Sequence, residues 1–80
     1  MITRRVKREL LNKTTEEIEN IITHPDLTHD ERWLIYHIYG KQRMVVNVCH
    51  KLHMSEPQFY ITQKLALTKL YYILELNKTL

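Results

Sequence analysis

The sequence of 80 residues contains one Gly, two Pro and one Cys. So few Gly and Pro residues leave few positions for tight turns, which argues against a hairpin-rich β fold and favours long helices. The lone cysteine, Cys49, cannot form a disulfide within the chain. The sequence also lacks an apolar run long enough for a signal peptide or a membrane span. We therefore expect a small all-α protein that is cytoplasmic and does not enter a membrane.

Charge is unevenly distributed along the chain, although its net value is only +3. Residues 1–13 carry five basic residues against one acid, whereas residues 14–40 carry six acids against one basic residue. Residues 41–53 carry three basic residues and no acid. The two basic segments are where an anionic partner such as DNA would bind. We expect residues 1–26, a basic arm with a helix, and residues 27–80 to form one compact unit.

Three helices are predicted before residue 41. The first places three apolar residues on one face, namely Ile2, Val6 and Leu10. The second starts at a cap supplied by Thr14 or Thr15 and ends before Pro25, because proline disfavours helical geometry at the preceding residue.

The third predicted helix runs from Thr28 to Gly40. Thr28 and Glu31 match a capping box, in which each side chain accepts a hydrogen bond from the other residue's backbone amide. Gly40, the only glycine, can take the left-handed conformation that ends helices. Trp33 and the tyrosines of this helix are expected to pack in the core or against a second copy, rather than around a ligand.

The segment Val45–Leu70 predicts a short helix, a tight turn and a long helix that continues to about Leu76. The turn contains His53, which must tolerate a positive φ angle. Ser55 caps the long helix, and Gln58 can reach back to it. This pattern predicts a helix-turn-helix, a unit whose second helix enters the major groove of DNA.

The segment Leu27–Leu70 resembles the promoter-reading region of bacterial sigma factors and, more closely, the small phage transcriptional regulators of the ArpU type. The residues that carry the resemblance are Leu27, Glu31-Arg32, Tyr39-Gly40, Val48-Cys49, Leu52, Met54-Ser55-Glu56, Gln58, Tyr60, Ala66-Leu67 and Lys69-Leu70. The resemblance implies a transcription regulator encoded by a phage or mobile element. Its partners would be double-stranded DNA in a bacterial host cell, RNA polymerase and a second copy of the chain.

The resemblance also implies which side chains contact DNA. The base-reading set is Glu56, Gln58, Tyr60, Ile61 and Lys64, with Gln63 as a further candidate. The phosphate-binding set is Lys41, Arg43, Lys51, Ser55, Arg4, Arg5 and Arg8. Two alternatives stay open: the basic arm is a solvated helix that covers the core, and the large side chains at positions 60 and 61 pack in a second protein interface.

Other function classes have weaker support in the sequence. Cys49, His50 and His53 could supply at most half of a four-ligand zinc site. An acid-base set could be drawn from His24, Asp26 and His29. The sequence has no Gly-rich phosphate loop and no convincing nucleophile, so we expect no metal, no cofactor and no enzyme activity. The main rival to DNA binding is a protein-interaction module that binds host RNA polymerase or a phage packaging component.

Overall fold

The computed structural model of the chain describes residues 2–76. The helices in this range are α1 (Ile2–Leu11), α2 (Thr15–Ile21), α3 (His29–Ile35), the π-helix η1 (Tyr36–Gly40), α4 (Val45–Leu52) and α5 (Glu56–Ile73). Residues 2–76 contain no strand, so the prediction of an all-α fold is confirmed. No helix in this part of the chain is long and apolar enough to cross a membrane.

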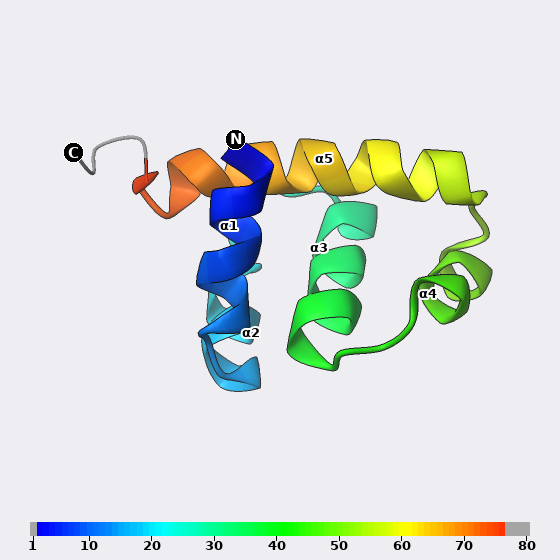
Figure 1. Cartoon of the computed structure of the whole chain (residues 1–80), viewed down its shortest axis with the longest axis horizontal. Helices are drawn as coiled ribbons and strands as arrows, with labels where there is room; N and C mark the ends of the chain where they lie inside the picture. The colour runs from blue at the N-terminus through cyan, green and yellow to red at the C-terminus, as the bar shows by residue number, and fades with distance from the viewer. Residues whose placement is uncertain (1, 77–80) are drawn as a thin grey trace.

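The long helix α5 lies along one side of the molecule, and α1, α3 and α4 all pack against it (Figure 1). Figure 1 shows α1 crossing the C-terminal half of α5, whereas α4 lies beneath its N-terminal end and α3 lies between them. The short helix α2 packs against η1 instead. The basic helix α1 and the helix α4 therefore contact opposite halves of α5.

One hydrophobic core joins these helices. Its largest fully buried side chains are Phe59, Leu10, Ile18, Leu34, Ile35, Leu67, Leu70 and Val6. Three of them come from the first 26 residues, so the N-terminal segment shares the core of the rest of the chain. The buried residues of α5 recur at spacings of three and four, which places them on one face of the helix.

The predicted N-terminal caps are confirmed, and Thr14 rather than Thr15 caps α2. The Thr14 hydroxyl accepts a hydrogen bond from the amide of Glu17 at 3.1 Å, and the Glu17 carboxylate accepts one from the Thr14 amide at 2.8 Å. Thr28 and Glu31 form the same pair of bonds at the start of α3, at 3.2 and 2.7 Å. These two boxes satisfy amides that a helix start would otherwise leave without partners.

The prediction that Gly40 ends its helix in the left-handed conformation is wrong. After α3 the chain continues as η1, in which the amide of Lys41 donates to the carbonyl of Tyr36 at 2.9 Å. The positive φ angle, 55°, belongs to Gln42. The carbonyl of Gly40 accepts a hydrogen bond from the Thr15 hydroxyl at 2.8 Å, so this end of the helix is joined to α2.

Helix α5 ends at Ile73, earlier than the predicted end near Leu76. The amide of Leu74 closes the last turn on the carbonyl of Leu70 at 2.8 Å, and Glu75 then takes a φ angle of 58°. A left-handed residue at this position stops the helix. Leu76, which follows it, is buried in the core.

A partly buried ion pair, in which the acid is buried and the lysine is half-buried, joins the start of α3 to α5. The carboxylate of Glu31 is almost fully buried and accepts a hydrogen bond from Lys69 at 2.8 Å as well as from the amide of Thr28. Lys69 also donates to the carbonyl of Asp26 at 3.0 Å. One ammonium group therefore holds the loop before α3, the α3 cap and α5 together.

We expect Lys69→Met to lower the free energy of unfolding by about 2 kcal/mol, between the values for exposed and fully buried pairs. The reason is that the substitution leaves the buried Glu31 carboxylate without its counter-charge. Lys64→Met, at an exposed position on the same helix, is the control. Urea denaturation followed by circular dichroism measures both, and equal midpoints for the two variants would contradict the assignment.

Candidate nucleic-acid interface

Helices α4 and α5 are joined by a tight turn whose geometry follows from four local features. His53 has φ 55° and ψ 45°, which confirms the predicted positive φ angle. The amide of Met54 donates to the carbonyl of Cys49 at 3.0 Å, which closes the end of α4. The Ser55 hydroxyl accepts from the amide of Gln58 at 3.3 Å, and proline fits the first turn of α5. Figure 1 shows α4 nearly end-on beneath the start of α5, so the two helix axes cross steeply.

The first three turns of α5 expose the whole predicted base-reading set. Its members Glu56, Gln58, Tyr60, Ile61 and Lys64 are all exposed. Positions 56, 60 and 64 are four residues apart and form one row, and positions 58 and 61 lie on a neighbouring row. The members with the larger side chains, Tyr60 and Ile61, are exposed to 53% and 63%.

Gln63 does not belong to this exposed set, so its candidacy as a base reader is wrong. Its side chain is buried, and its amide nitrogen donates to the Tyr39 hydroxyl at 2.9 Å. The bond joins α5 to η1 inside the protein. Buried polar groups need such partners, which explains why a glutamine is tolerated on the core face of the helix.

Three residues of the predicted phosphate-binding set lie near the imidazole of His37. Burial lowers the pKa of His37, and three nearby positive charges lower it further: Arg43, Lys51 and Lys41. Two of these residues, Arg43 and Lys51, also line a small cavity of about 20 Å³ with His37. We call Lys41, Arg43 and Lys51 the basic cluster. All three side chains are exposed to solvent, so together they offer positive charge beside α4.

The remaining predicted phosphate contacts are not part of the basic cluster. Arg4 and Arg8 are exposed and Arg5 is half-buried, but all three lie on α1, which packs on the far half of α5 (Figure 1). Ser55 is exposed, but its hydroxyl already serves as the α5 cap. The structure therefore brings together three of the seven residues proposed to contact phosphate.

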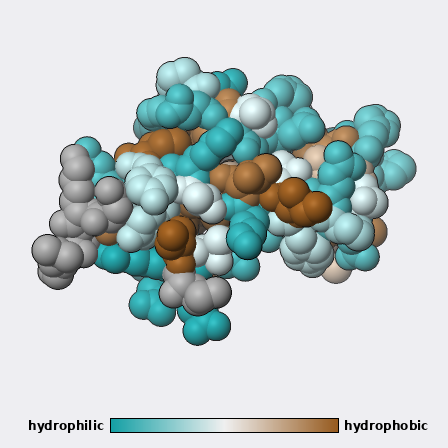
Figure 2. All heavy atoms as spheres, turned by 90° about the horizontal axis from the view of Figure 1, so that it is seen from above, coloured by the Kyte–Doolittle hydropathy of each residue, from teal (hydrophilic) through white to brown (hydrophobic). Residues whose placement is uncertain are grey.

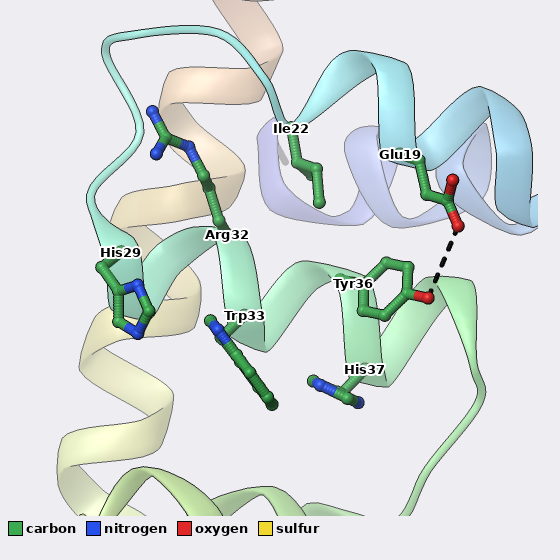
Figure 3. A pocket seen from close by; sticks show the side chains of 7 residues that line it. All are labelled: Glu19, Ile22, His29, Arg32, Trp33, Tyr36 and His37. Atoms are coloured by element: carbon green, nitrogen blue, oxygen red, sulfur yellow. Dashed lines mark hydrogen bonds between the residues drawn. The ribbon is translucent and has the colours of Figure 1, made fainter.

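An open cavity of about 470 Å³, for which the sequence gives no prediction, lies between α2 on one side and α3 with η1 on the other (Figure 3). Trp33 lines this cavity and is 37% exposed, so the expectation that it lies in the core is wrong, whereas packing against a second copy stays a prediction. The signal that could have revealed the site is the spacing of His29, Trp33 and His37. Residues four apart share a helix face, so these three rings form one row.

The residues considered for a metal site do not form one. Residues 2–76 contain no group of three or more His, Cys, Asp or Glu side chains placed to hold a metal ion. Cys49 is buried. Burial raises the pKa of its thiol and the nearby Glu56 carboxylate raises it further, which disfavours the thiolate that would bind a metal.

We expect the protein to lose stability in acid through His37. Because its pKa is lowered by folding from about 6.5, the unfolded chain binds more protons near that pH. The stability contributed by neutral His37 is present above the unfolded pKa and is lost as the pH falls through the folded pKa. His37→Gln should flatten the dependence of the urea midpoint on pH below about 6.5. His50→Gln, at an exposed position, should leave it unchanged; parallel curves for wild type and His37→Gln would refute the assignment.

Comparisons with protein-family models, with curated proteins and with solved structures found no match for this chain. The resemblance to ArpU-type regulators therefore stays a prediction made from the residues. What the chain does has to be argued from the geometry and charge described above.

Proposed function

We propose that this chain is a sequence-specific DNA-binding transcription regulator of the ArpU-like phage type, acting in the cytoplasm of a bacterial host cell. In this proposal α4 and α5 act as a helix-turn-helix, and α5 enters the major groove. The observation that carries the proposal is the basic cluster, which gathers three cations beside α4. The exposed polar row at the start of α5 supports it.

The basic cluster would bind the phosphate backbone and set the register of the protein on the duplex. Lys and Arg neutralise phosphates and release counterions, so the affinity would fall steeply with salt. Arg43 adds a planar guanidinium, which can hold a phosphate through two hydrogen bonds. Phosphates near the basic cluster would also offset the positive charges that lower the pKa of His37. Binding of DNA would therefore raise the pKa of this residue.

The exposed row of α5 would read the bases. Gln58 can pair with adenine and Lys64 with the O6 and N7 atoms of guanine. Glu56 can accept a hydrogen bond from cytosine, and Ile61 can contact a thymine methyl group. Tyr60 packs edge-on against Phe59 with ring centroids 5.1 Å apart, which restricts the position of its exposed ring.

The three arginines of α1 would contact DNA only if the duplex ran along α5. Helix α1, which carries them, crosses the C-terminal half of α5, whereas α4, which carries Lys51, lies beneath the N-terminal end (Figure 1). The same basic face of α1 could instead contact RNA polymerase. The regulator proposal requires only the basic cluster and the start of α5.

A second candidate function is a protein-interaction module, which an apolar stripe on the outer face of α5 favours. Ile61, Leu65 and Tyr72 are 63%, 54% and 57% exposed, and with Thr68 they follow spacings of four, three and four. Such spacing is typical of the contact line between two helices. Figure 2 looks down on α5 from above and shows hydrophobic surface in the middle of this face, surrounded by hydrophilic side chains. In this alternative the stripe would bind RNA polymerase, a packaging component or a second copy.

We expect Lys51→Gln to weaken binding to every duplex and to lower the salt dependence by about one counterion. Gln58→Ala should instead cost about 1–3 kcal/mol on the preferred site only, since it removes a base contact. Lys7→Gln, on α1 and exposed, is the control for a lost positive charge. Fluorescence anisotropy with a duplex selected from a random pool, measured over a series of salt concentrations, checks all three.

Two results would contradict the DNA-binding proposal. One is the absence of binding at low salt, and the other is a salt dependence that Lys51→Gln and Lys7→Gln change equally. The substitution Leu65→Glu distinguishes the rival function, because it places a charge in the apolar stripe without removing a member of the base-reading set. Loss of a bound protein partner with DNA affinity retained would assign the stripe to protein contacts.

A further inference from the structure

An open cavity lies between α2 on one side and α3 with η1 on the other. Its volume of about 470 Å³ lies in the range of small-molecule sites. It is lined by Glu19, Ile22, His29, Arg32, Trp33, Tyr36 and His37. Figure 3 shows these side chains around one hollow, with aromatic rings along one side and Arg32 and Ile22 on the other.

Two residues that line this cavity each carry a buried polar atom without a hydrogen-bond partner. Among residues 2–76, the buried side-chain nitrogen and oxygen atoms without a hydrogen-bond partner are Nε of Arg32 and Nδ1 of His37. Both residues line the cavity, and His37 is only 8% exposed. An unsatisfied buried donor or acceptor is costly and rare in folded proteins. A ligand that supplied the missing partner would remove this cost.

The charge of the cavity is separated between its two ends. At one end Arg32 donates through Nη2 to the carbonyl of His24 at 3.2 Å, which anchors the guanidinium. At the other, the Glu19 carboxylate accepts a hydrogen bond from the Tyr36 hydroxyl at 3.4 Å (Figure 3). The anchored guanidinium attracts an anion and repels a cation, and its fork of donors matches a carboxylate.

The aromatic wall selects a flat, apolar body for the ligand. Trp33 stacks on His37 with ring centroids 4.3 Å apart, which holds the indole in place. His29 lies 6.2 Å from the same indole on the exposed side. Tyr36 is held edge-on to His37 at 5.1 Å, and Ile22 adds an aliphatic contact. Rings that are already fixed lose little entropy when another ring packs against them.

We propose that this cavity binds a small aromatic carboxylate. The carboxylate accepts hydrogen bonds from Arg32, and the ring packs against Trp33, Tyr36 and Ile22. Because the Nε atom is covered in the free protein, binding includes a shift of the side chains that cover it. The site adjoins the basic cluster at His37, but its ligand contacts Arg32 and Trp33 and requires no DNA. The failure of this site and the failure of the proposed function are therefore separate results.

The single tryptophan makes the proposal directly testable, because Trp33 contributes the only indole N–H signal of the protein. The uniformly ¹⁵N-labelled chain is titrated with indole-3-acetate, indole-3-acetamide and tryptamine, which share a ring and differ in charge. Indole-3-acetate should move the Trp33 signal saturably and bind about tenfold more tightly than the amide or the amine. Arg32→Gln should abolish this preference for the acid, whereas Arg8→Gln, an exposed arginine on α1, should retain it.

Three results would overturn the proposal. They are a Trp33 signal that does not move up to about 10 mM acid, equal binding of acid and amide, and tightest binding of the amine. Should Arg32→Gln fail to fold, two measurements on the wild-type chain decide the question. They are the ratio of acid to amide affinity and the movement of the Arg32 Nε–H signal on addition of the acid: a preference with movement supports the site, and either one absent refutes it.

Discussion

Burial against α5 is the constraint on which the structure depends. A chain this short has little surface to bury, and here one long helix supplies the common face for α1, α3 and α4. Phe59, Leu67 and Leu70 sit on that face and are almost wholly buried. The Glu31–Lys69 pair fixes the angle at which α3 meets the same helix. Because α1, α3 and α4 pack on one face of α5, this packing also sets the positions of the basic cluster and of the open cavity lined by Trp33.

The parts of the fold that could be predicted from sequence are those set by local chemistry. The capping boxes at Thr14 and Thr28 depend on residues three apart, and the positive φ angle of His53 follows from the tight turn. The end of the third helix could not be predicted in this way. There the carbonyl of Gly40 accepts a hydrogen bond from Thr15, which lies 25 residues earlier, and Gln42 takes the positive φ angle; no local pattern encodes a contact over this separation. Gln63 likewise appears polar in sequence and is buried only because Tyr39 provides its partner.

The residues of the candidate DNA-binding surface show the same difference between features set by local sequence and features set by contacts between distant residues. Helical periodicity is sufficient to place Gln58 and Lys64 on the outside of α5, so their exposure was predictable. The basic cluster was predictable in composition but not in position. Its members belong to a loop and a helix that converge near His37 only once α4 has packed beneath α5. The exposure of Trp33 within the chain was not predictable, because a tryptophan is usually largely buried in so small a domain.

His37 connects the two proposed binding surfaces through its protonation. It lines the open cavity beside Trp33, and the basic cluster lowers its pKa. A carboxylate in the cavity and phosphates at the basic cluster would each stabilise the protonated imidazole. When two anions each bind the protonated state more tightly, the binding of one increases the affinity for the other. Thermodynamic linkage makes this coupling reciprocal. Under both proposals, therefore, an aromatic acid would tighten DNA binding at pH values near the pKa of His37 and would lose this effect where the imidazole does not titrate.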